Sequence, residues 1–280
     1  MNRFPRGLTY HRVSGGGNDF ILLDARGLDD AAAPDRLARA LCRRGLSLGA
    51  DGLVWITAAG EADLAVTYFN ADGSRAFCGN GTLCAARWAH VHGDMPSSMR
   101  LETDQGILSL KVSGARVEMS VPPPTGVRDD ISLQPAGLPG TGIAIDTGCP
   151  HLVVLCSTLP DDGTFAVAAP ILRYHPDLGP AGANVDFVAV QDPHRLQVRT
   201  FERGVEAETL ASGTGCLAAA LAAATRSLAA APVACQVRGG APLKVRFTRA
   251  AATFSNVSLE GEARLVAMGT VGDDAFAGED

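Results

Sequence analysis

Two short segments of this 280-residue chain are near copies of one another. The first begins at Cys78 and reads CGNGTLCAA, and the second begins at Ser212 and reads SGTGCLAAA. Each has a small nucleophilic side chain, then a Gly-x-Gly turn, then a run of Leu and Ala. The two copies lie almost half the chain apart, so they predict two related halves.

Each copy predicts a loop that ends at the start of a helix. Gly-x-Gly is a flexible turn, and the residues that follow are good helix formers. Cys78 and Ser212 would then be N-cap residues. The first N–H groups of a helix have no partner inside the helix, and this end carries a partial positive charge. Both turns are therefore predicted to attract an anionic group.

The segments that precede the two turns also occur in the same order. Ala50 lies as far before Cys78 as Asn184 lies before Ser212, and strand-like runs follow both residues. We predict an α/β (α+β) fold with two pseudo-symmetric domains. Each would be a curved mixed sheet or barrel wrapped around a central helix.

The local pattern predicts individual elements and a domain boundary. Helices are predicted over residues 34–44 and 82–92, and strands over 8–13, 21–24, 53–56, 64–69, 100–103, 107–112, 116–121, 142–147 and 152–155. Three prolines at 122–124 cannot continue a strand ladder. We expect an N-terminal domain of 1–124, joined by the C-terminal segment of about 265–280, and a second domain of 125–264. The active site would lie in the interdomain cleft.

Composition argues against several classes of protein. The net charge of −6 argues against nucleic acid as a partner. The longest apolar run, residues 216–224, is too short to span a membrane, and residues 1–7 lack the apolar core of a signal peptide. Seven cysteines without disulfide-like spacing are typical of free thiols in a reducing compartment. We expect a cytoplasmic protein that binds neither nucleic acid nor membrane.

No cofactor and no metal are predicted. The chain has two lysines, Lys111 and Lys244, and neither lies near a Gly-rich phosphate cradle, which argues against pyridoxal phosphate. The spacing of the cysteines and histidines does not match a metal site. The stretch from Gly213 to Ala218 fits a relaxed dinucleotide fingerprint. However, it follows a charged segment, and no acidic residue lies about 20 positions later.

Two small nucleophilic groups at two helix N-termini suit proton transfer on opposite faces of one carbon. A helix N-terminus makes a thiolate easier to form. Its N–H groups would bind a substrate carboxylate and the charge that develops when the α-proton leaves. One side chain would remove the proton and the other would return it from the far face, without a cofactor.

Six segments together resemble the diaminopimelate epimerase family along nearly the whole chain. They are GGGNDF (15–20), GADG (49–52), YFNADGSRAFCGNG (68–81), TGCPH (147–151), ANVDFV (183–188) and FERGVEAETLASGTG (201–215). The resemblance implies a cofactor-independent isomerase with two pseudo-symmetric domains. Its implied reaction interconverts LL- and meso-diaminopimelate for lysine and peptidoglycan synthesis. It also implies a homodimer.

The resemblance implies roles for individual residues. Candidate catalytic residues are Cys78, Ser212, His151 and Glu202. Candidate substrate-binding residues are Asn18, Asn70, Gly79, Asn80, Asn184, Glu202, Arg203, Gly213 and Thr214. The four residues at the helix ends would bind the α-carboxylate, Glu202 the amino groups, and Arg203 the distal carboxylate.

Some of these residues also have purely structural interpretations. Asn18 and Asn70 could serve only in turns, and His151 could be a packing residue. Arg203 could simply pair with Glu202 or Glu206.

The chain departs from the family at Ser212, where the family has its second catalytic cysteine. A serine hydroxyl is a far weaker acid than a thiol. The serine could be an engineered change, or a natural variant that acts on another amino acid as racemase, epimerase or single-thiol lyase. It could also mark a homologue that binds a ligand without catalysis. Cys216, about 5–6 Å further along the helix, is a weak substitute. Cys149 stands where many members carry asparagine, which leaves the exact substrate open.

Overall fold

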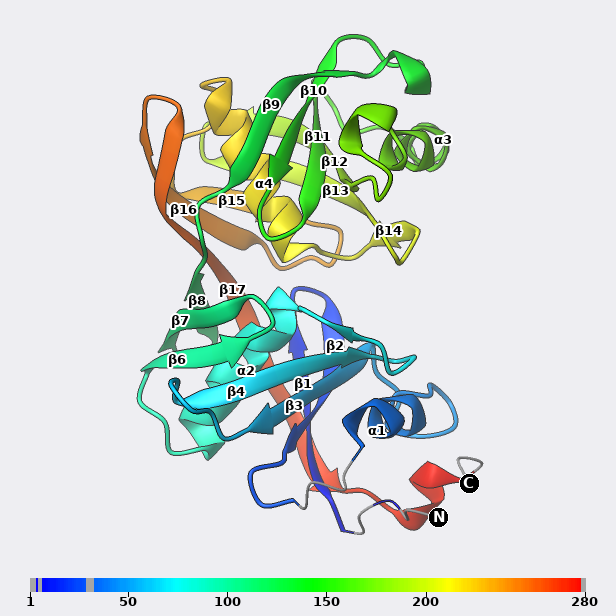
Figure 1. Cartoon of the computed structure of the whole chain (residues 1–280), viewed down its shortest axis with the longest axis vertical. Helices are drawn as coiled ribbons and strands as arrows, with labels where there is room; N and C mark the ends of the chain where they lie inside the picture. Colours follow the sequence, from blue (N-terminus) through cyan, green and yellow to red (C-terminus); the bar gives the residue numbers. More distant parts are fainter. Residues whose placement is uncertain (1–3, 5–6, 29–32, 278–280) are drawn as a thin grey trace. The chain divides into compact units, whose positions relative to one another are not determined.

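The structure is a computed structural model that describes residues 4, 7–28 and 33–277. The N-terminal residues 1–3 and 5–6, on which the expectation of no signal peptide largely rests, lie outside the described residues, as do 29–32 and 278–280. The chain forms two compact units (Figure 1). The first contains the described residues up to Met119 and those from Gly261 onward, and the second spans Ser120–Glu260.

In the described part of the first unit, eight strands pair in a closed ring. In ring order they are β1 (Thr9–Gly15), β2 (Asn18–Asp24), β3 (Gly52–Thr57), β4 (Leu64–Asn70), β6 (Ser98–Thr103), β7 (Gly106–Ser113), β8 (Arg116–Ser120) and the C-terminal part of β17 (Thr253–Thr270). The pairs β2–β3 and β4–β6 are parallel. The short strand β5 (Arg75–Ala76) extends β4. The ring is therefore a mixed barrel.

Helix α2 (Gly79–His92) packs against strands β1, β2, β3, β4 and β7 of this ring. Its residues 80–86 are all buried, and a helix that is buried on every side lies inside its sheet. Helix α1 (Pro34–Leu41) is amphipathic and buries Leu37 and Leu41 in a separate core with Ile21 and Leu53. The central helix places the CGNG turn at one end of the barrel.

The second unit repeats this order of pairings. Its strands are β9 (Thr125–Ser132), β10 (Thr141–Asp146), β11 (Pro150–Cys156), β12 (Asn184–Asp192), β13 (Arg195–Glu202), β15 (Val233–Gln236), β16 (Leu243–Ala250) and the N-terminal part of β17. The pairs β11–β12 and β13–β15 are parallel, as are their counterparts β2–β3 and β4–β6. The short strand β14 (Ala207–Thr209) extends β13, as β5 extends β4.

Helix α4 (Gly213–Thr225) is the central helix of the second unit and contacts β10, β11, β12, β13, β15 and β16. Residues 215–224 are all buried, and most of them are alanines, whose small side chains let the strands approach closely. Helix α3 (Asp162–Arg173) packs Phe165 and Leu172 in another core, with Phe187 and Phe201. The predicted fold of two pseudo-symmetric halves, each a curved mixed sheet around a central helix, is confirmed.

Three short 3-10 helices complete the described elements: η1 (Gln134–Ala136), η2 (Pro176–Leu178) and η3 (Asp273–Phe276). Among the helices of the described residues, none combines the length and the apolar character that crossing a membrane requires.

Candidate functional site

The two central helices begin in the same way at the two repeated turns. Cys78 caps α2 in an extended conformation (φ −131°, ψ 107°), and its Sγ accepts the N–H of Gly81 at 3.4 Å. Ser212 caps α4 with φ −123° and ψ 118°, and its Oγ accepts the N–H of Gly215 at 3.1 Å. Both predicted N-caps are confirmed. The sequence repeat is therefore also a repeat of backbone geometry.

Each helix begins with N–H groups that precede its first intrahelical hydrogen bonds. These bonds run from Thr82 N to Cys78 O and from Cys216 N to Ser212 O, both at 2.9 Å. The N–H groups of the preceding residues, Gly79 and Asn80 in α2 and Gly213 and Thr214 in α4, have no acceptor inside their helix. With the helix dipole behind them, they can bind a carboxylate.

In the first unit, a chain of amide contacts surrounds the start of α2. Asn80 Nδ2 donates to Asn18 Oδ1 at 3.0 Å, and Asn18 Nδ2 donates to Asp51 Oδ2 at 3.0 Å. The Asn80 side chain is buried, yet its Oδ1 has no hydrogen-bond partner among the described residues. Because an unsatisfied buried acceptor is costly, this oxygen is suited to receive an N–H donor from a ligand.

Ion pairs join the two Gly-rich segments at residues 15–20 and 49–52. Arg44 pairs with Asp51 at 2.7 Å and also contacts Asp19, which Arg12 contacts at 2.5 Å. Burial would raise the pKa of Asp19, but the Arg44 hydrogen bond and the Arg12 charge outweigh it and lower the pKa. The Asp19 carboxylate therefore stays ionised, and Asp51 keeps Asn18 in place by accepting from its Nδ2.

Asn70 lies at the end of β4, where its side chain holds a turn. Its Nδ2 donates to Ser74 Oγ at 2.9 Å, and its backbone N–H donates to Ser74 O at 2.8 Å. The structure therefore gives this residue a turn-stabilising contact, as one of the two sequence interpretations expected.

In the second unit, His151 and Asp186 form a buried pair behind the start of α4. His151 Nδ1 lies 2.6 Å from Asp186 Oδ2, and Thr200 Oγ1 donates to Asp186 Oδ1 at 2.7 Å. Burial alone would lower the pKa of His151, but the charge and hydrogen bond of Asp186 raise it to about 10. A Cβ on Gly215 would come within 2.5 Å of Asp186 Oδ1, so glycine is required for this carboxylate to pack against α4.

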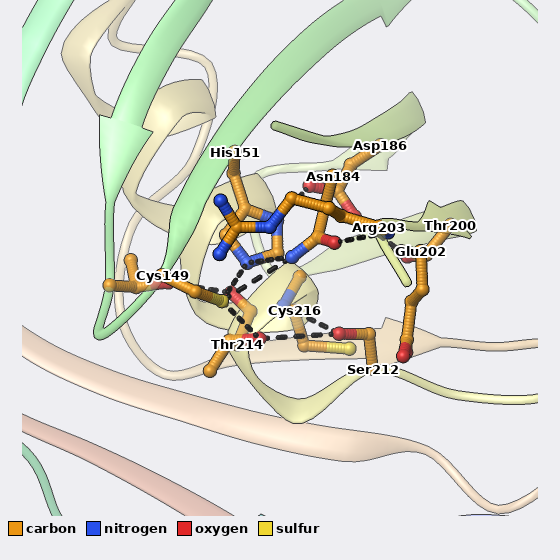
Figure 2. A network of polar contacts seen from close by, with 12 residues as sticks. Cys149, His151, Asn184, Asp186, Thr200, Glu202, Arg203, Ser212, Thr214 and Cys216 are labelled. Atoms are coloured by element: carbon orange, nitrogen blue, oxygen red, sulfur yellow. Dashed lines mark hydrogen bonds and ion pairs between the residues drawn. The ribbon is translucent and has the colours of Figure 1, made fainter. Parts of the chain in front are cut away.

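Cys149 joins this pair from the other side of the imidazole ring (Figure 2). Its Sγ lies 3.3 Å from His151 Nε2 and 3.5 Å from Thr214 Oγ1, and Asn184 Nδ2 donates to it at 3.3 Å. Asn184 Oδ1 accepts the backbone N–H of Arg203 at 2.7 Å, which fixes the orientation of the amide. Burial raises the pKa of Cys149, but the hydrogen bond and charge of His151 outweigh burial, and the pKa is lowered.

From the sequence, Cys149 was predicted only as a departure from the family pattern, and Asp186 was not predicted as a site residue. A signal existed for both. Cys149 and His151 are two residues apart at the start of a strand, as are Asn184 and Asp186, so each pair shares one face of its strand. The parallel pairing of β11 with β12 sets His151 opposite Asn184 and brings the two pairs together.

Glu202 and Arg203 follow at the end of β13. Glu202 Oε1 accepts from Thr209 Oγ1 at 2.9 Å. Burial raises the pKa of Glu202, and hydrogen bonds from Thr209 and Ser212 offset this only in part. Glu206 receives Arg173 at 3.0 Å rather than the guanidinium of Arg203. Among the described residues, neither Glu202 nor Glu206 therefore forms an ion pair with Arg203. The guanidinium of Arg203 is suited to bind an anion.

Comparison with known proteins decides the family. The family model described as diaminopimelate epimerase matches residues 11–124 and 143–266. The diaminopimelate epimerase of Chlorobaculum tepidum is 37% identical over 92% of this chain and 99% of its own length. That of Gemmatimonas aurantiaca is 40% identical over 76% of this chain and 78% of its own. This chain belongs to the diaminopimelate epimerase family.

The fold of this diaminopimelate epimerase family member also occurs in more distant proteins. A phenazine biosynthesis protein of the PhzF family from Bacillus anthracis superposes with a TM-score of 0.74. The match covers 95% of this chain and 99% of that one at 16% identity. At this identity the likeness shows the fold alone.

The structure brings most of the candidate residues together within their own units. In the first unit, Cys78, Gly79 and Asn80 form the start of α2, and Asn18 contacts Asn80. In the second unit, the start of α4 and its surroundings hold Ser212, Gly213, Thr214, His151, Asn184, Glu202 and Arg203. Within the described ranges, no group of three or more His, Cys, Asp or Glu side chains could hold a metal ion.

Cys216 is poorly placed to act as a reactive thiol at the start of α4. It is fully buried within α4, and Cys235 Sγ donates to its backbone oxygen at 3.6 Å. Hydrogen bonding by Cys235 and burial raise its pKa well above that of an ordinary thiol. In this diaminopimelate epimerase family member, the thiol that follows Ser212 along the helix is therefore part of the core.

Proposed function

We propose that this chain is an isomerase that epimerises LL-diaminopimelate to meso-diaminopimelate by proton transfer at the α-carbon, without a cofactor. Membership of the diaminopimelate epimerase family supports the reaction class. The observation that carries the proposal is the matched pair of capped helix N-termini at Cys78 and Ser212. Each is a half-site on one unit, and the reaction requires both half-sites to contact one substrate molecule.

The substrate α-carboxylate would be bound by the N–H groups of Gly79, Asn80, Gly213 and Thr214. When a base removes the α-proton, the electron pair spreads onto this carboxylate. Two helix N-termini would stabilise that charge better than water does, because their dipoles already point at it. A second group would then give a proton to the opposite face of the same carbon, which inverts it. Cys78 is one of these two groups in the proposal.

The remaining candidates would hold the rest of the substrate. Arg203 is suited to clamp the distal carboxylate with two parallel hydrogen bonds. Asn80 Oδ1 and the Glu202 carboxyl are acceptors for the substrate's ammonium groups. The side chains of Asn18, Asn70 and Asn184 would complete the polar surroundings of the substrate. His151 would act beside the α-carbon at which the proton is exchanged.

Two further parts of the proposal concern the protein in the cell. We propose a homodimer in the cytoplasm, with each compact unit acting as one domain of the enzyme. The state of the cysteines supports the location, because all seven are free thiols in the structure. Light scattering on a gel-filtration column tests the dimer, and a single protomer mass would exclude it.

The reaction is tested by proton NMR of LL- and meso-diaminopimelate in D2O. We expect the chain to exchange the α-proton and to interconvert the two epimers, and Cys78→Ala to abolish interconversion. If the unmodified chain exchanges no α-proton, the assignment fails. A panel that includes β-substituted amino acids would then identify a racemase or lyase for another substrate. Thermal stabilisation by a ligand without exchange would instead identify a binding protein.

A further inference from the structure

The proposed reaction needs two side chains that can gain and lose a proton at the α-carbon. Cys78 can supply one of them. Ser212 is poorly suited to be the other, because a hydroxyl holds its proton too tightly at neutral pH. In this structure its Oγ also accepts the N–H of Gly215 at 3.1 Å and lies 3.3 Å from Thr214 Oγ1.

We propose that Cys149, held by His151 and Asp186, is the second proton-transfer group of this enzyme, in place of Ser212. The inference rests on the proposed function, because only that function brings both half-sites to one substrate. It assigns a catalytic role to a residue outside the two repeated turns.

Cys149 lies beside Thr214, close to where the substrate α-carboxylate would bind. Its Sγ lies 3.5 Å from Thr214 Oγ1, and the same hydroxyl lies 3.3 Å from Ser212 Oγ (Figure 2). Thr214 also supplies one of the N–H groups proposed to bind the α-carboxylate. The α-carbon is one bond away from that carboxylate, so a thiol beside Thr214 is placed to reach the α-proton.

Comparison with the other thiols of the second unit is the second argument. Cys216 and Cys235 are fully buried. Cys156 lies at the far end of β11, where its Sγ contacts the backbone oxygen of Val188 at 3.3 Å, and burial raises its pKa. Of the four cysteines in this unit, Cys149 alone is both partly exposed and in contact with the start of α4.

The groups around Cys149 are the third argument. The fixed amide of Asn184 donates to its sulfur, and His151 Nε2 lies 3.3 Å away. On the far side of the ring, Asp186 contacts His151 Nδ1 and favours the doubly protonated imidazole. N–H groups that donate to a sulfur atom stabilise its thiolate form. The resting site would therefore hold a thiolate at Cys149 and a thiol at Cys78.

The transfer balances without any further reactant. The Cys149 thiolate takes the α-proton and becomes a thiol, while the electron pair stays on the substrate. The Cys78 thiol gives its proton to the opposite face and becomes a thiolate. The reverse reaction runs with the roles exchanged, and proton exchange with water restores the resting state.

Glu202 is the rival for this role. It lies close enough to Ser212 to share a hydrogen bond, and burial raises its pKa. However, Thr209 occupies its Oε1 at 2.9 Å, and no imidazole contacts it directly. The experiment therefore includes Glu202→Gln.

Epimerisation and α-deuterium exchange are measured separately for LL- and meso-diaminopimelate in D2O. Cys149→Ala is expected to lower epimerisation by about 10²–10⁴-fold, the usual contribution of a general acid or base. The remaining Cys78 can still remove and return a proton on its own face. Slow exchange without inversion should thus persist for one epimer, and Cys78→Ala should leave exchange in the other. A residue that only positions the substrate would reduce both epimers equally.

Two further variants complete the design. Ser212→Cys in the Cys149→Ala background places a thiol at the N-cap of α4, as Cys78 is at the N-cap of α2, and should restore epimerisation at least tenfold. Cys156→Ser is the matched control, because it removes a thiol of the same unit outside the site, and its activity should stay within twofold. Thermal unfolding of each variant checks the fold.

The possible outcomes separate the two proposals. If the unmodified chain shows no α-proton exchange, the proposed function fails and this inference fails with it. If the unmodified chain epimerises and Cys149→Ala does so within twofold, or loses exchange equally for both epimers, the inference alone is wrong. If exchange persists in one epimer only for Glu202→Gln, and not for Cys149→Ala, the role belongs to Glu202.

Discussion

His151 Nδ1 lies 2.6 Å from Asp186 Oδ2, and neither side chain is exposed to solvent. A buried charge pair of this kind is stable only when its remaining polar atoms are also satisfied. Thr200 satisfies the other oxygen of Asp186, and Cys149 Sγ lies 3.3 Å from the other nitrogen of His151. The pair therefore connects the interior of the second unit to the start of α4.

Asp186→Asn should lower the pKa of His151 from about 10 toward or below 6.5. Asp186 is the main group that raises this pKa, and burial would then dominate and lower it. Titration of the histidine ring by NMR measures the change. An unchanged His151 would show that the Asp186 charge does not set its protonation.

The alkylation of Cys149 should depend on pH through His151. Only the thiolate reacts, so the rate of iodoacetamide labelling follows the pKa of the thiol. In the unmodified chain the midpoint should lie below 9, because His151 outweighs burial. In His151→Gln it should lie above 9, because burial remains. Peptide mass spectrometry separates this site from Cys78, and equal midpoints in the two proteins would contradict the expectation.

Glu202→Gln should stabilise the protein progressively as the pH rises from 4 to 7. The folded-state pKa of Glu202 is raised above 4.5, so its favourable contribution is present below 4.5 and is lost as pH rises through the folded value. Glutamine does not titrate and can still accept from Thr209. The difference in the free energy of unfolding should grow by about 1.4 kcal/mol per pKa unit of the shift. Urea unfolding at both pH values measures it, and a constant difference would contradict the burial argument.

Gly215→Ala should destabilise the second unit by about 1–3 kcal/mol. The added Cβ would come within 2.5 Å of Asp186 Oδ1 and 2.9 Å of Thr200 Oγ1, and both groups are fixed by their hydrogen bond. Gly163→Ala in α3 is the matched control, because the nearest atom to its Cβ would be Asp161 Oδ1 at 3.6 Å. Alanine should be neutral or stabilising there. Equal effects on urea unfolding would show that the contact with Asp186 is not tight.

Arg203→Lys should weaken diaminopimelate binding more than it slows the chemistry. Lysine keeps the charge but loses the planar fork that binds a carboxylate with two hydrogen bonds. We expect KM to rise about 10–100-fold, the loss of one charge-assisted hydrogen bond, with kcat close to unchanged. A fall in kcat with unchanged KM would show that Arg203 does not hold the distal carboxylate.

Glycine and proline residues inside helices explain where the predicted helices differ from the observed ones. The helix that follows Cys78 was predicted from residue 82 and begins at Gly79, because the two glycines that suggested a loop form its first turn. Helix α3 was not predicted, because Pro170 lies inside it and Gly163 lies in its first turn. Its N-cap, Asp161, which accepts from Thr164 N at 2.7 Å, was the available signal.

The sequence by itself determined the repeated halves, the two N-caps and the family, because these depend on short motifs whose spacing is visible along the chain. Only the tertiary structure decided which thiol contacts Thr214 at the start of α4. Spacing offered Cys216 only as a weak substitute, and that position faces the packed interior of the second unit. Cys149 lies more than sixty residues earlier, and hydrogen bonds with His151, Asn184 and Thr214 bring it to the start of α4. Contacts of that kind come from strand pairing, which a linear pattern does not record.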